Sequence, residues 1–544
     1  MYNEPPTDAG VSGADDFTCL VEGLMQPRAY PHPVERAERI ETHISEVLLA
    51  GDFAYKLKKP IELGFLDFST RERRRHFCDE EIRLNRRLAA DIYLDVVPIT
   101  GTPAEPCVGG SGPALEYAVR MRRFPQEALL DRQPLSVPLA KRLAELVADF
   151  HASLPIATDV SGFGRLDAVL DPMFENIRQV RQNAIIAGNR ARLDRLERWT
   201  GARARTLAPI IEQRRRQGYV RECHGDMHRG NIALVGETIH IFDAIEFNPN
   251  LRWIDTASEI AFLVMDMEQA DEKAAAGVFL NRYLERSGDY GALALLDFYK
   301  VYRAMVRAKV IVIRLAQGDL DLAAEAEERA RCTRYLELAE SYTRPRQPCL
   351  LIACGLSGSG KSRLSFQLRE TLPLIHVRSD VERKRLFGLD ELSRTSSGLD
   401  AGIYFPTATN WTYDRLHCLA DTILASGYDV LVDATFLSRQ RRERFIRLAH
   451  RHQAAYAILA LDAPLDILRQ RVRRRLQLSQ DPSEASLTVL ERQHASRQCL
   501  SDEETTHAVH IDTSCTAPFP EILERLERAL HHHQTLPAVL AERR

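Results

Sequence analysis

The chain has 544 residues, of which 45% are hydrophobic and 27% charged, and its formal net charge at pH 7 is −3. This length predicts at least two domains, and the near-neutral charge gives no general attraction to nucleic acid or to a membrane surface. No apolar run is long enough to span a bilayer, the N-terminus is polar and acidic, and the ten cysteines are scattered. We therefore expect a cytoplasmic protein with no membrane partner.

Helix-breaking residues and hydrophobic periodicity divide the chain into three parts. The first 30 residues are rich in Pro, Gly and Asp, and we expect a poorly ordered tail there. Apolar residues recur with helical spacing over residues 295–315 and 322–338, and two prolines within residues 343–348 then predict a linker. The predicted parts are a tail over residues 1–30, a first domain over 31–344 and a second domain over 345–535.

A lysine-bearing strand is the first element that carries chemistry. Residues 47–60 predict two strands joined by a Gly-Asp turn at residues 51–52. Residues two apart on a strand share a face, so Ala54 and Lys56 point in the same direction. This pattern fits an alanine that faces an adenine ring beside a lysine that pairs with phosphate. Lys58 shares the same face and is the rival candidate.

The next two elements complete a predicted nucleotide-binding lobe. A lysine of this kind needs a glutamate partner on a helix, and the helix predicted over residues 72–88 offers Glu80 and Glu81. Counting back seven residues from Leu88, at the end of this helix, favours Glu81. Residues 117–124 predict a strand that runs into a hinge between lobes, where backbone groups around Met121 are placed to pair with an adenine edge.

A polar loop supplies the predicted phosphoryl-transfer residues. His224, Asp226 and Asn231 follow the spacing His-x-Asp-x-x-x-x-Asn, and the strand predicted after them ends in Asp243. In kinase chemistry the aspartate of such a loop orients the substrate hydroxyl, and the asparagine and the later aspartate bind Mg²⁺. The spacing matters because one loop and one hairpin must aim three oxygen ligands at a single nucleotide.

These motifs resemble the aminoglycoside phosphotransferase family, which has a bilobal protein-kinase-like fold. The resemblance covers the lysine strand, the His-Gly-Asp loop and the strand that ends in Asp243. It implies that Asp226 is catalytic, that Asn231 and Asp243 are metal ligands and that Lys56 anchors the nucleotide. The lysine strand also resembles a branch of this family with no assigned substrate, often fused to a P-loop kinase domain. The fold alone names no acceptor.

A complete phosphate-binding loop begins the second domain. Residues 355–362 read Gly-Leu-Ser-Gly-Ser-Gly-Lys-Ser, with a predicted buried strand before them and a predicted helix after them. Glycines let successive backbone N–H groups converge on a polyphosphate, while the lysine reaches the β- and γ-phosphates and the last serine binds Mg²⁺. The predicted nucleotide-binding residues are Gly355, Ser357, Gly358, Ser359, Gly360, Lys361 and Ser362, of which Lys361 is also expected to act in catalysis and Ser362 as a metal ligand.

The rest of this domain predicts a parallel sheet with helices on both faces. Strands alternate with helical patterns, and the predicted strands are residues 350–353, 374–377, 430–432, 457–461 and 509–511. Asp380 and Arg383 follow the second of these strands, and an aspartate there is able to accept the proton of an attacking hydroxyl. Asp433 ends the third strand, where it is either a Mg²⁺-side carboxylate or a cap of the strand.

Five arginines lie within residues 469–475, and helical spacing places Arg471 and Arg475 on one face. Such a face is fit to clamp transferring phosphates, as a lid does, although a basic surface helix that binds nothing is an equal alternative. Residues 481–486 resemble the end of a mobile lid.

The second domain resembles P-loop kinases of small molecules and polynucleotides, including gluconate kinase-like and zeta toxin-like enzymes. In those families Asp380 and Arg383 would contact the substrate. The expected fold class is an α+β bilobal kinase-like domain followed by an α/β parallel-sheet P-loop NTPase domain. We expect a bifunctional phosphotransferase with ATP and Mg²⁺ at two sites and small-molecule hydroxyl acceptors.

Two alternatives to this reading stay open. In the first, one half is silent and acts as a nucleotide-sensing module for the other. In the second, the chain is a nucleic-acid end kinase, which Asp380 and Arg383 suggest. A nucleic-acid partner would need a basic groove, and the net charge of −3 gives little support for one.

Overall fold

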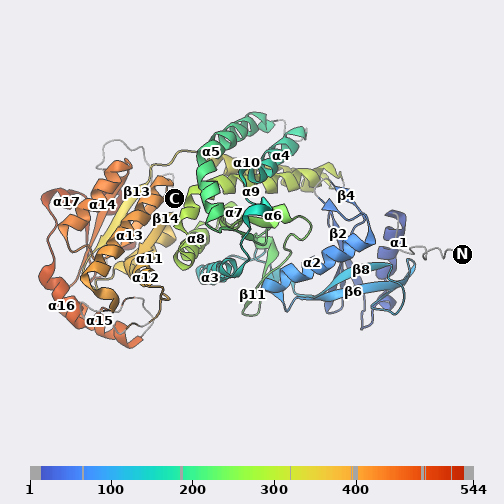
Figure 1. Ribbon diagram of the computed structural model, residues 1–544, viewed down its shortest axis with the longest axis horizontal. Helices are drawn as coiled ribbons and strands as arrows, with labels where there is room; N and C mark the ends of the chain where they lie inside the picture. Colours follow the sequence, from blue (N-terminus) through green and yellow to red (C-terminus); the bar gives the residue numbers. More distant parts are fainter. Residues whose placement is uncertain are drawn as a thin grey trace. The chain divides into compact units, whose positions relative to one another are not determined.

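The computed structural model describes residues 14–63, 66–183, 188–318, 320–393, 395, 402–478, 483, 485–515 and 518–531 (Figure 1). The chain divides into two compact units. Unit 1 comprises Met1–Leu135, Phe150–Asn176 and Ala208–Asp266, and unit 2 comprises Ser136–Asp149, Ile177–Leu207 and Met267–Arg544. The helices that precede the predicted linker therefore group with the P-loop domain.

Unit 1 contains a six-stranded antiparallel sheet with the strand order β1-β2-β3-β8-β6-β7. Strands β2 and β3 form the predicted hairpin, and Gly51 at its turn has a left-handed backbone (φ 57°) that favours glycine. Helix α2 (Arg71–Ala89) begins at the N-cap Thr70, and its apolar side packs on β6 and β8. The strands are β1 (Ala37–Glu41), β2 (Ser45–Ala50), β3 (Phe53–Lys58), β6 (Tyr93–Thr102), β7 (Glu105–Val108) and β8 (Glu116–Arg122).

The segment before this sheet contains a helix, whereas the sequence predicts a poorly ordered tail over residues 1–30. Residues 1–13 lie outside the described part of the chain, but helix α1 (Ala14–Leu24) follows them. Its apolar residues recur at positions i, i+3, i+4 and i+7, and all four are buried against the sheet: Phe17, Leu20, Val21 and Leu24. The Pro, Gly and Asp content of the first residues obscured this apolar stripe, so the prediction of poor order is wrong for residues 14–30.

The remaining elements of unit 1 carry the polar loop. Strands β10 and β11 form a hairpin directly after this loop, and β9 pairs with β12. The bounds are β4 (Glu62–Leu63), β5 (Leu66–Asp67), β9 (Val220–Glu222), β10 (Ile232–Val235), β11 (Thr238–Ile241), α6 (Pro249–Arg252), β12 (Trp253–Asp255) and α7 (Thr256–Gln269). Short 3-10 turns lie at Pro27–Ala29, Gln126–Ala128, Asp159–Ser161 and Arg229–Asn231.

Long helices make up the chain between the two predicted phosphate-handling regions. The helices predicted over residues 295–315 and 322–338 are confirmed as α9 (Leu293–Ala316) and α10 (Leu322–Ser341), which pack against each other. The other helices are α3 (Val137–Ser153), α4 (Leu166–Gln182), α5 (Arg190–Arg216) and α8 (Lys273–Ser287), with a 3-10 turn at Tyr290–Ala292.

The P-loop domain within unit 2 contains a five-stranded parallel sheet with the order β14-β15-β13-β16-β17. All five predicted strands are confirmed, as β13 (Cys349–Cys354), β14 (Leu374–Arg378), β15 (Asp429–Asp433), β16 (Ala455–Asp462) and β17 (Ala508–Asp512). The three middle strands are buried almost throughout, since helices pack on both faces. These helices are α11 (Lys361–Thr371), α12 (Ser379–Leu386), α13 (Pro406–Ala425), α14 (Arg439–Arg451), α15 (Leu465–Leu478), α16 (Leu487–Ser496), α17 (Asp502–Thr506) and α18 (Phe519–His531), with a 3-10 turn at Gly402–Tyr404.

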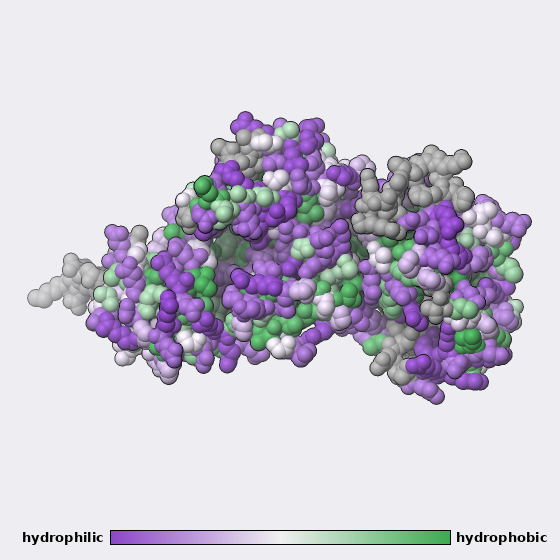
Figure 2. Space-filling view, turned by 180° about the vertical axis from the view of Figure 1, so that it is seen from behind, coloured by the Kyte–Doolittle hydropathy of each residue, from purple (hydrophilic) through white to green (hydrophobic). Residues whose placement is uncertain are grey.

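The predicted fold class is confirmed by these two sheets. Among the described residues, no helix combines the length and the apolar character needed to cross a membrane. On the face shown in Figure 2, hydrophilic residues are interspersed with smaller groups of hydrophobic ones.

Candidate active sites

Lys56 on β3 lies at the centre of a buried ionic cluster in unit 1. Its Nζ is 2.9 Å from Glu81 Oε1 on α2 and 2.5 Å from Asp243 Oδ1. Burial lowers the pKa of Lys56, but Asp243 and Glu81 outweigh burial and hold this pKa well above its usual value. The side chain of Asp243 remains 45% exposed, so the lysine and this carboxylate meet at a place that solvent reaches.

Lys58, the rival on the same face of β3, occupies a different environment. Its side chain is fully buried, its Nζ donates to Glu81 Oε2 at 2.7 Å, and it also pairs with Glu246. The ammonium group lies 5.0 Å from the centre of the Phe68 ring. Because Lys58 is enclosed by protein, it is placed to hold Glu81 rather than to meet a ligand. Glu80, the other glutamate that the sequence offered, pairs with Arg83 instead.

Asp226 and Asn231 lie together on the polar loop. Asn231 Nδ2 donates to the backbone oxygen of Asp226 at 3.0 Å and to its Oδ2 at 3.1 Å. His228 Nε2 is 3.5 Å from the same Oδ2. The side chain of Asp226 is 33% exposed, so the carboxylate is oriented by its neighbours and still accessible.

Asp243 follows β11 in a strained backbone conformation. Its φ is 63°, a value that an aspartate adopts only when the surroundings impose it. Its N–H donates to Tyr93 Oη at 3.2 Å, and the next N–H, that of Ala244, donates to Asn85 Oδ1 at 2.9 Å. His224 Nε2 hydrogen bonds to Phe242 O at 2.8 Å, which ties the polar loop to this segment. These contacts fix the direction in which the Asp243 carboxylate points.

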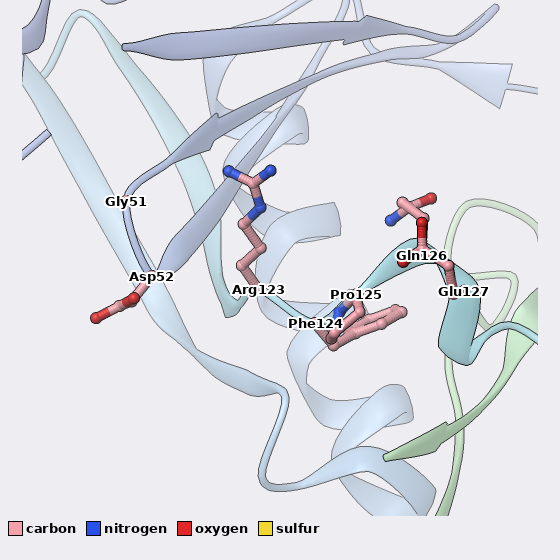
Figure 3. Close-up of a pocket in the computed structure, with 7 residues that line it drawn as sticks. All are labelled: Gly51, Asp52, Arg123, Phe124, Pro125, Gln126 and Glu127. Carbon is pink, nitrogen blue, oxygen red and sulfur yellow. The ribbon is translucent and has the colours of Figure 1, made fainter. Parts of the chain in front are cut away.

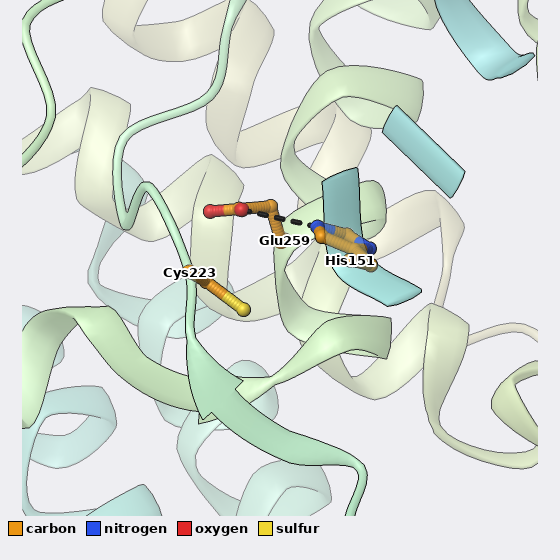
Figure 4. A group of neighbouring side chains, drawn as sticks. All are labelled: His151, Cys223 and Glu259. Carbon is orange, nitrogen blue, oxygen red and sulfur yellow. Dashed lines mark hydrogen bonds and ion pairs between the residues drawn. The ribbon is translucent and has the colours of Figure 1, made fainter. Parts of the chain in front are cut away.

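A buried glutamate on α7, Glu259, anchors the polar loop and lies beside His151 and Cys223 (Figure 4). Glu259 accepts hydrogen bonds from the N–H groups of His224 and Gly225, at 2.9 and 2.6 Å, and His151 Nε2 lies 3.2 Å from it. Burial raises the pKa of Glu259, but the hydrogen bond and the charge of His151 and the contacts with His224 outweigh burial and lower this pKa to about 2.

The group formed by His151, Cys223 and Glu259 has donor atoms within 4.8 Å of one another, a spacing compatible with a metal ion. Both carboxylate oxygens of Glu259 already accept hydrogen bonds from the loop, and Cys223 Sγ is 3.6 Å from Ile254 O. The group is therefore explained by the support it gives to the loop that carries Asp226.

A pocket of about 450 Å³ lies at the hinge (Figure 3). It is lined by the β2–β3 turn and by the segment that follows β8, namely Gly51, Asp52, Arg123, Phe124, Pro125, Gln126 and Glu127. Met121 lies on β8 opposite Ala54, on the strand next to the one that carries Lys56, but it does not line this pocket, and its pairing with an adenine edge stays a prediction. The pocket thus marks the hinge and contains none of the carboxylates described above.

The phosphate-binding loop in unit 2 has the backbone that its glycines permit. Gly358 and Gly360 have φ values of 82° and 87°, in the left-handed region. A Cβ added at Gly358 would lie 3.1 Å from Leu468 O, so a larger residue here would be both crowded and strained in its backbone. Lys361 Nζ folds back on the loop and donates to Gly355 O and Leu356 O at 3.0 and 2.9 Å. Burial lowers the pKa of Lys361, and the carboxylates of Asp433 and Asp380 oppose this effect.

Ser362 and Asp433 are brought together as the metal prediction requires. Ser362 Oγ, in the first turn of α11, donates to Oδ2 of Asp433, at the end of β15, at 2.7 Å. His376 on β14, whose side chain is fully buried, has its Nε2 3.5 Å from the same oxygen. Burial raises the pKa of Asp433, but His376, Lys361 and Arg378 outweigh burial and lower it to about 2. Asp433 is therefore a carboxylate beside the loop whose surroundings favour its charged form, and its role as a metal ligand stays a prediction.

The predicted substrate-side residues lie on α12. Asp380 is in the first turn of this helix, near enough to Lys361 to affect its pKa. Arg383 Nη1 donates to Ile403 O at 3.1 Å and to Thr409 Oγ1 at 3.3 Å, and its guanidinium lies 4.9 Å from the centre of the Tyr404 ring. Arg383 thus holds the 402–404 turn in this structure.

The two predicted clamp arginines on α15 contact protein acceptors. Arg471 Nη1 donates to Gly358 O at 3.2 Å, and its Nη2 donates to Thr513 O at 2.6 Å. Arg475 Nη2 donates to Ala485 O at 3.0 Å. Arg471 therefore joins α15 to the phosphate-binding loop, and the clamp roles stay predictions. Within the predicted lid end at 481–486, residues 481, 482 and 484 lie outside the described residues, and Ser486 is the N-cap of α16.

Comparison with known proteins agrees with this geometry. The model of a family described as "Phosphotransferase enzyme family" matches residues 66–296, and one described as "AAA domain" matches residues 350–500. An uncharacterized protein of Mycobacterium tuberculosis (strain ATCC 25618 / H37Rv) is 31% identical over 492 residues, which is 89% of this chain and 94% of that protein. The chain belongs to the phosphotransferase enzyme family. A Mycobacterium bovis protein matches to the same extent.

Solved structures resemble one or the other part of this phosphotransferase. The amicoumacin kinase hAmiN is 14% identical (TM-score 0.36) and covers 60% of this chain and 93% of its own. A choline/ethanolamine kinase family protein from Mesorhizobium loti is 14% identical (TM-score 0.33) and covers 60% of this chain and 99% of its own. A gluconokinase from Sinorhizobium meliloti is 21% identical (TM-score 0.23) and covers 36% of this chain and 95% of its own.

Several residues that shape the two sites of this phosphotransferase were not found from the sequence. Glu259 and Glu246 come from elements that follow the polar loop, and no fixed spacing links either to it. Gln493 on α16 accepts a hydrogen bond from the N–H of Ser357 at 2.9 Å, although it lies 136 residues away along the chain. His376 was read only as part of a strand. Each of these four residues is recognised by its closeness to the site in the folded chain, which a single sequence does not report.

Proposed function

We propose that this phosphotransferase is bifunctional and that each of its two parts transfers the γ-phosphoryl group of ATP to a hydroxyl group of a small molecule. The observation that supports the proposal is that two separate groups of residues with the chemistry to handle phosphate each come together in the fold. Lys56, Glu81 and Asp243 converge in unit 1, and Lys361, Ser362 and Asp433 converge in unit 2. A cytoplasmic location, where ATP is available, is part of the proposal.

The donor atoms in unit 1 fit Mg²⁺. Asp243 is a partly exposed carboxylate whose direction is fixed, and Asn231 uses its Nδ2 for Asp226 and so keeps its Oδ1 as a ligand atom. Mg²⁺ prefers such oxygen ligands. We propose that Asn231 and Asp243 hold the ion, that Lys56 pairs with nucleotide phosphates and that Asp226 orients the acceptor hydroxyl.

The loop in unit 2 fits a polyphosphate. Ser359 Oγ is buried there without a hydrogen-bond partner among the described atoms, and the left-handed glycines keep the backbone open to a ligand. Lys361 holds only two loop carbonyl groups, which a phosphate would replace. We propose that Ser362 and Asp433 bind Mg²⁺ and that Asp380 accepts the proton of the acceptor hydroxyl. When bound, ATP supplies the phosphoryl group, and the ion offsets its charge.

A screen of a metabolite library for acceptor-dependent ATP consumption tests the proposal. The full chain is compared with its Asp226→Ala and Lys361→Ala variants. We expect two groups of acceptors, one lost with Asp226→Ala alone and the other with Lys361→Ala alone. If Asp226→Ala abolishes every reaction and Lys361→Ala abolishes none, the second part is not a kinase. Phosphorylation of oligonucleotide ends but of no small molecule would favour the nucleic-acid alternative.

A further inference from the structure

Strand β14 lies at the edge of the parallel sheet, and its outer side is covered by a helix rather than by a strand (Figure 1). Asn281 on α8 forms the contact. Its Nδ2 donates to Leu374 O at 2.8 Å, and its Oδ1 accepts from the N–H of His376 at 2.7 Å. In a parallel sheet, one residue of a neighbouring strand bonds in the same way to the C=O and N–H groups of residues two apart. The side-chain amide of Asn281 thus takes the place of one residue of a sixth strand.

This contact is buried and held in one orientation. Asn281 is 2% exposed, and its Nδ2 also donates to Gly277 O, one turn earlier on the same helix, at 2.9 Å. Most of α8 from Ala275 to Glu285 is buried as well. A buried backbone group that loses its hydrogen-bond partner is unfavourable, so β14 depends on this amide.

Ion pairs extend the contact along β14 and the segment that follows it. Arg282 Nη1 donates to Glu285 Oε2 at 2.9 Å and to Glu391 Oε2 at 2.8 Å, and Glu285 Oε1 lies 3.4 Å from Arg378 Nη1. Arg286 Nη1 donates to Asp390 Oδ2 at 3.0 Å. These side chains belong to one compact unit, in which α8 is surrounded by complementary charges.

The strand held in this way leads into the candidate site of the P-loop domain. His376, whose N–H is bound by Asn281, has its ring beside Asp433, the carboxylate that holds Ser362. Arg378 at the end of β14 pairs in register with Asp433, and Asp380 follows two residues later. A shift of β14 would therefore move the substrate-side aspartate and the surroundings of the metal-side aspartate together.

We propose that α8 is a working part of the P-loop site and that Asn281 is the positioning residue through which it acts. All of α8, including Asn281, lies within residues 66–296, which match the phosphotransferase family, whereas β14 lies within residues 350–500, which match the other family model, so the contact joins these two matched parts of the chain. The inference goes beyond the proposed function, because it concerns how the P-loop site is held and not which acceptor it uses. It also predicts that cutting the chain at residues 343–348 damages the P-loop site.

Hydrogen–deuterium exchange on the full chain tests the contact. In the wild-type protein the His376 amide, although on an edge strand, should exchange as slowly as amides of the central strand β13. In Asn281→Leu, which keeps the branched shape of the side chain but removes its hydrogen bonds, exchange at His376 should accelerate by roughly tenfold while exchange in β16 stays unchanged. Fast exchange at His376 in the wild type would overturn the proposal without the need for any variant.

Nucleotide affinity separates a positioning role from a purely structural one. Binding of AMP-PNP with Mg²⁺ is measured in chains that also carry Lys56→Met, so that the P-loop site dominates. Asn281→Leu should weaken this binding by about tenfold, whereas Asn176→Leu, which removes another buried amide in unit 1, should leave it unchanged. Faster exchange with unaltered affinity would overturn the positioning role. If the parent chain binds no nucleotide, the proposed function fails and the positioning role fails with it, while the exchange result still decides whether Asn281 holds β14.

Discussion

At the scale of single residues, strand β3 shows how position separates two lysines that look equivalent in sequence. Lys56 and Lys58 share one face of the strand and both contact Glu81. Lys56 also contacts the partly exposed Asp243, while Lys58 is closed in by Glu246 and Phe68. The first lysine is therefore expected to bind nucleotide and the second to keep Glu81 in place.

Substitution of each lysine by methionine should separate these two roles. In Lys58→Met, Glu81 keeps Lys56, but the buried Glu246 loses its lysine partner, which should cost about 3–5 kcal/mol of folding free energy. Lys56→Met should cost less, because Glu81 keeps Lys58, but it should weaken AMP-PNP binding roughly 10- to 100-fold. Urea unfolding and calorimetric titration, in chains that carry Lys361→Ala to silence the second site, measure the two effects. If AMP-PNP binding were weakened in Lys58→Met and unchanged in Lys56→Met, the roles assigned to the two lysines would be wrong.

Asp226→Asn should impair chemistry and spare nucleotide binding. The substitution keeps the size of the side chain and removes the charge that orients the acceptor hydroxyl, while Asn231 and Asp243 remain to hold the metal ion. We expect kcat for the first reaction to fall by about 10²- to 10⁴-fold with little change in nucleotide Kd. Turnover near that of the wild type, once an acceptor has been found, would show that Asp226 is misassigned.

At the scale of elements, helix α7 determines the position of the polar loop through Glu259. The pKa of this glutamate is lowered to about 2, from about 4.3 in an unfolded chain. Its stabilising effect is therefore complete above about pH 4.3 and is lost as the pH falls toward 2. Up to about 3 kcal/mol of folding free energy depends on this ionisation.

Glu259→Gln should accordingly be less stable than the wild type at pH 7, and the difference should narrow as the pH is lowered to 3. Urea unfolding at pH 7, 5 and 3 measures the difference, with the exposed Glu524→Gln on α18 as the control. A difference that stays constant across this range would mean that Glu259 is not ionised in the folded protein.

Lys361→Ala should disable the phosphate-binding loop without unfolding it. In the structure Lys361 holds only the loop carbonyl groups of Gly355 and Leu356, so its removal leaves the strand, the helix and the glycine conformations in place. We expect the melting temperature without ligand to change little, and nucleotide binding in a Lys56→Met chain to fall by tenfold or more. A collapsed fold, or binding that is unchanged, would show that residues 355–362 are structural.

The same elements show what the sequence was able to predict. Each strand of the parallel sheet, the lysine hairpin, the long helices and both phosphate motifs depend on short-range patterns, and the structure has all of them. The helix over residues 14–24 had a clear apolar stripe, but the composition around it suggested disorder. Glu259, His376 and Asn281 had no local signal at all, since each acts through a partner brought close only by folding.

At the scale of the whole molecule, the chain joins two candidate phosphate-handling sites, and the segment between them is more than a simple linker. Residues 343–348 are irregular, as predicted, but α8 lies before them and holds β14 after them. A helix from the part before residues 343–348 therefore supports a strand of the P-loop domain within unit 2. For this reason the two candidate sites are best studied in the full chain.

The central claim is that one chain binds two nucleotides, and calorimetric titration of the full chain with AMP-PNP and Mg²⁺ tests it most directly. We expect two molecules bound per chain in the wild type, one in Lys56→Met, one in Lys361→Ala and none in the double variant. A wild-type stoichiometry of one nucleotide per chain, with all binding lost in one of the two single variants, would contradict the claim.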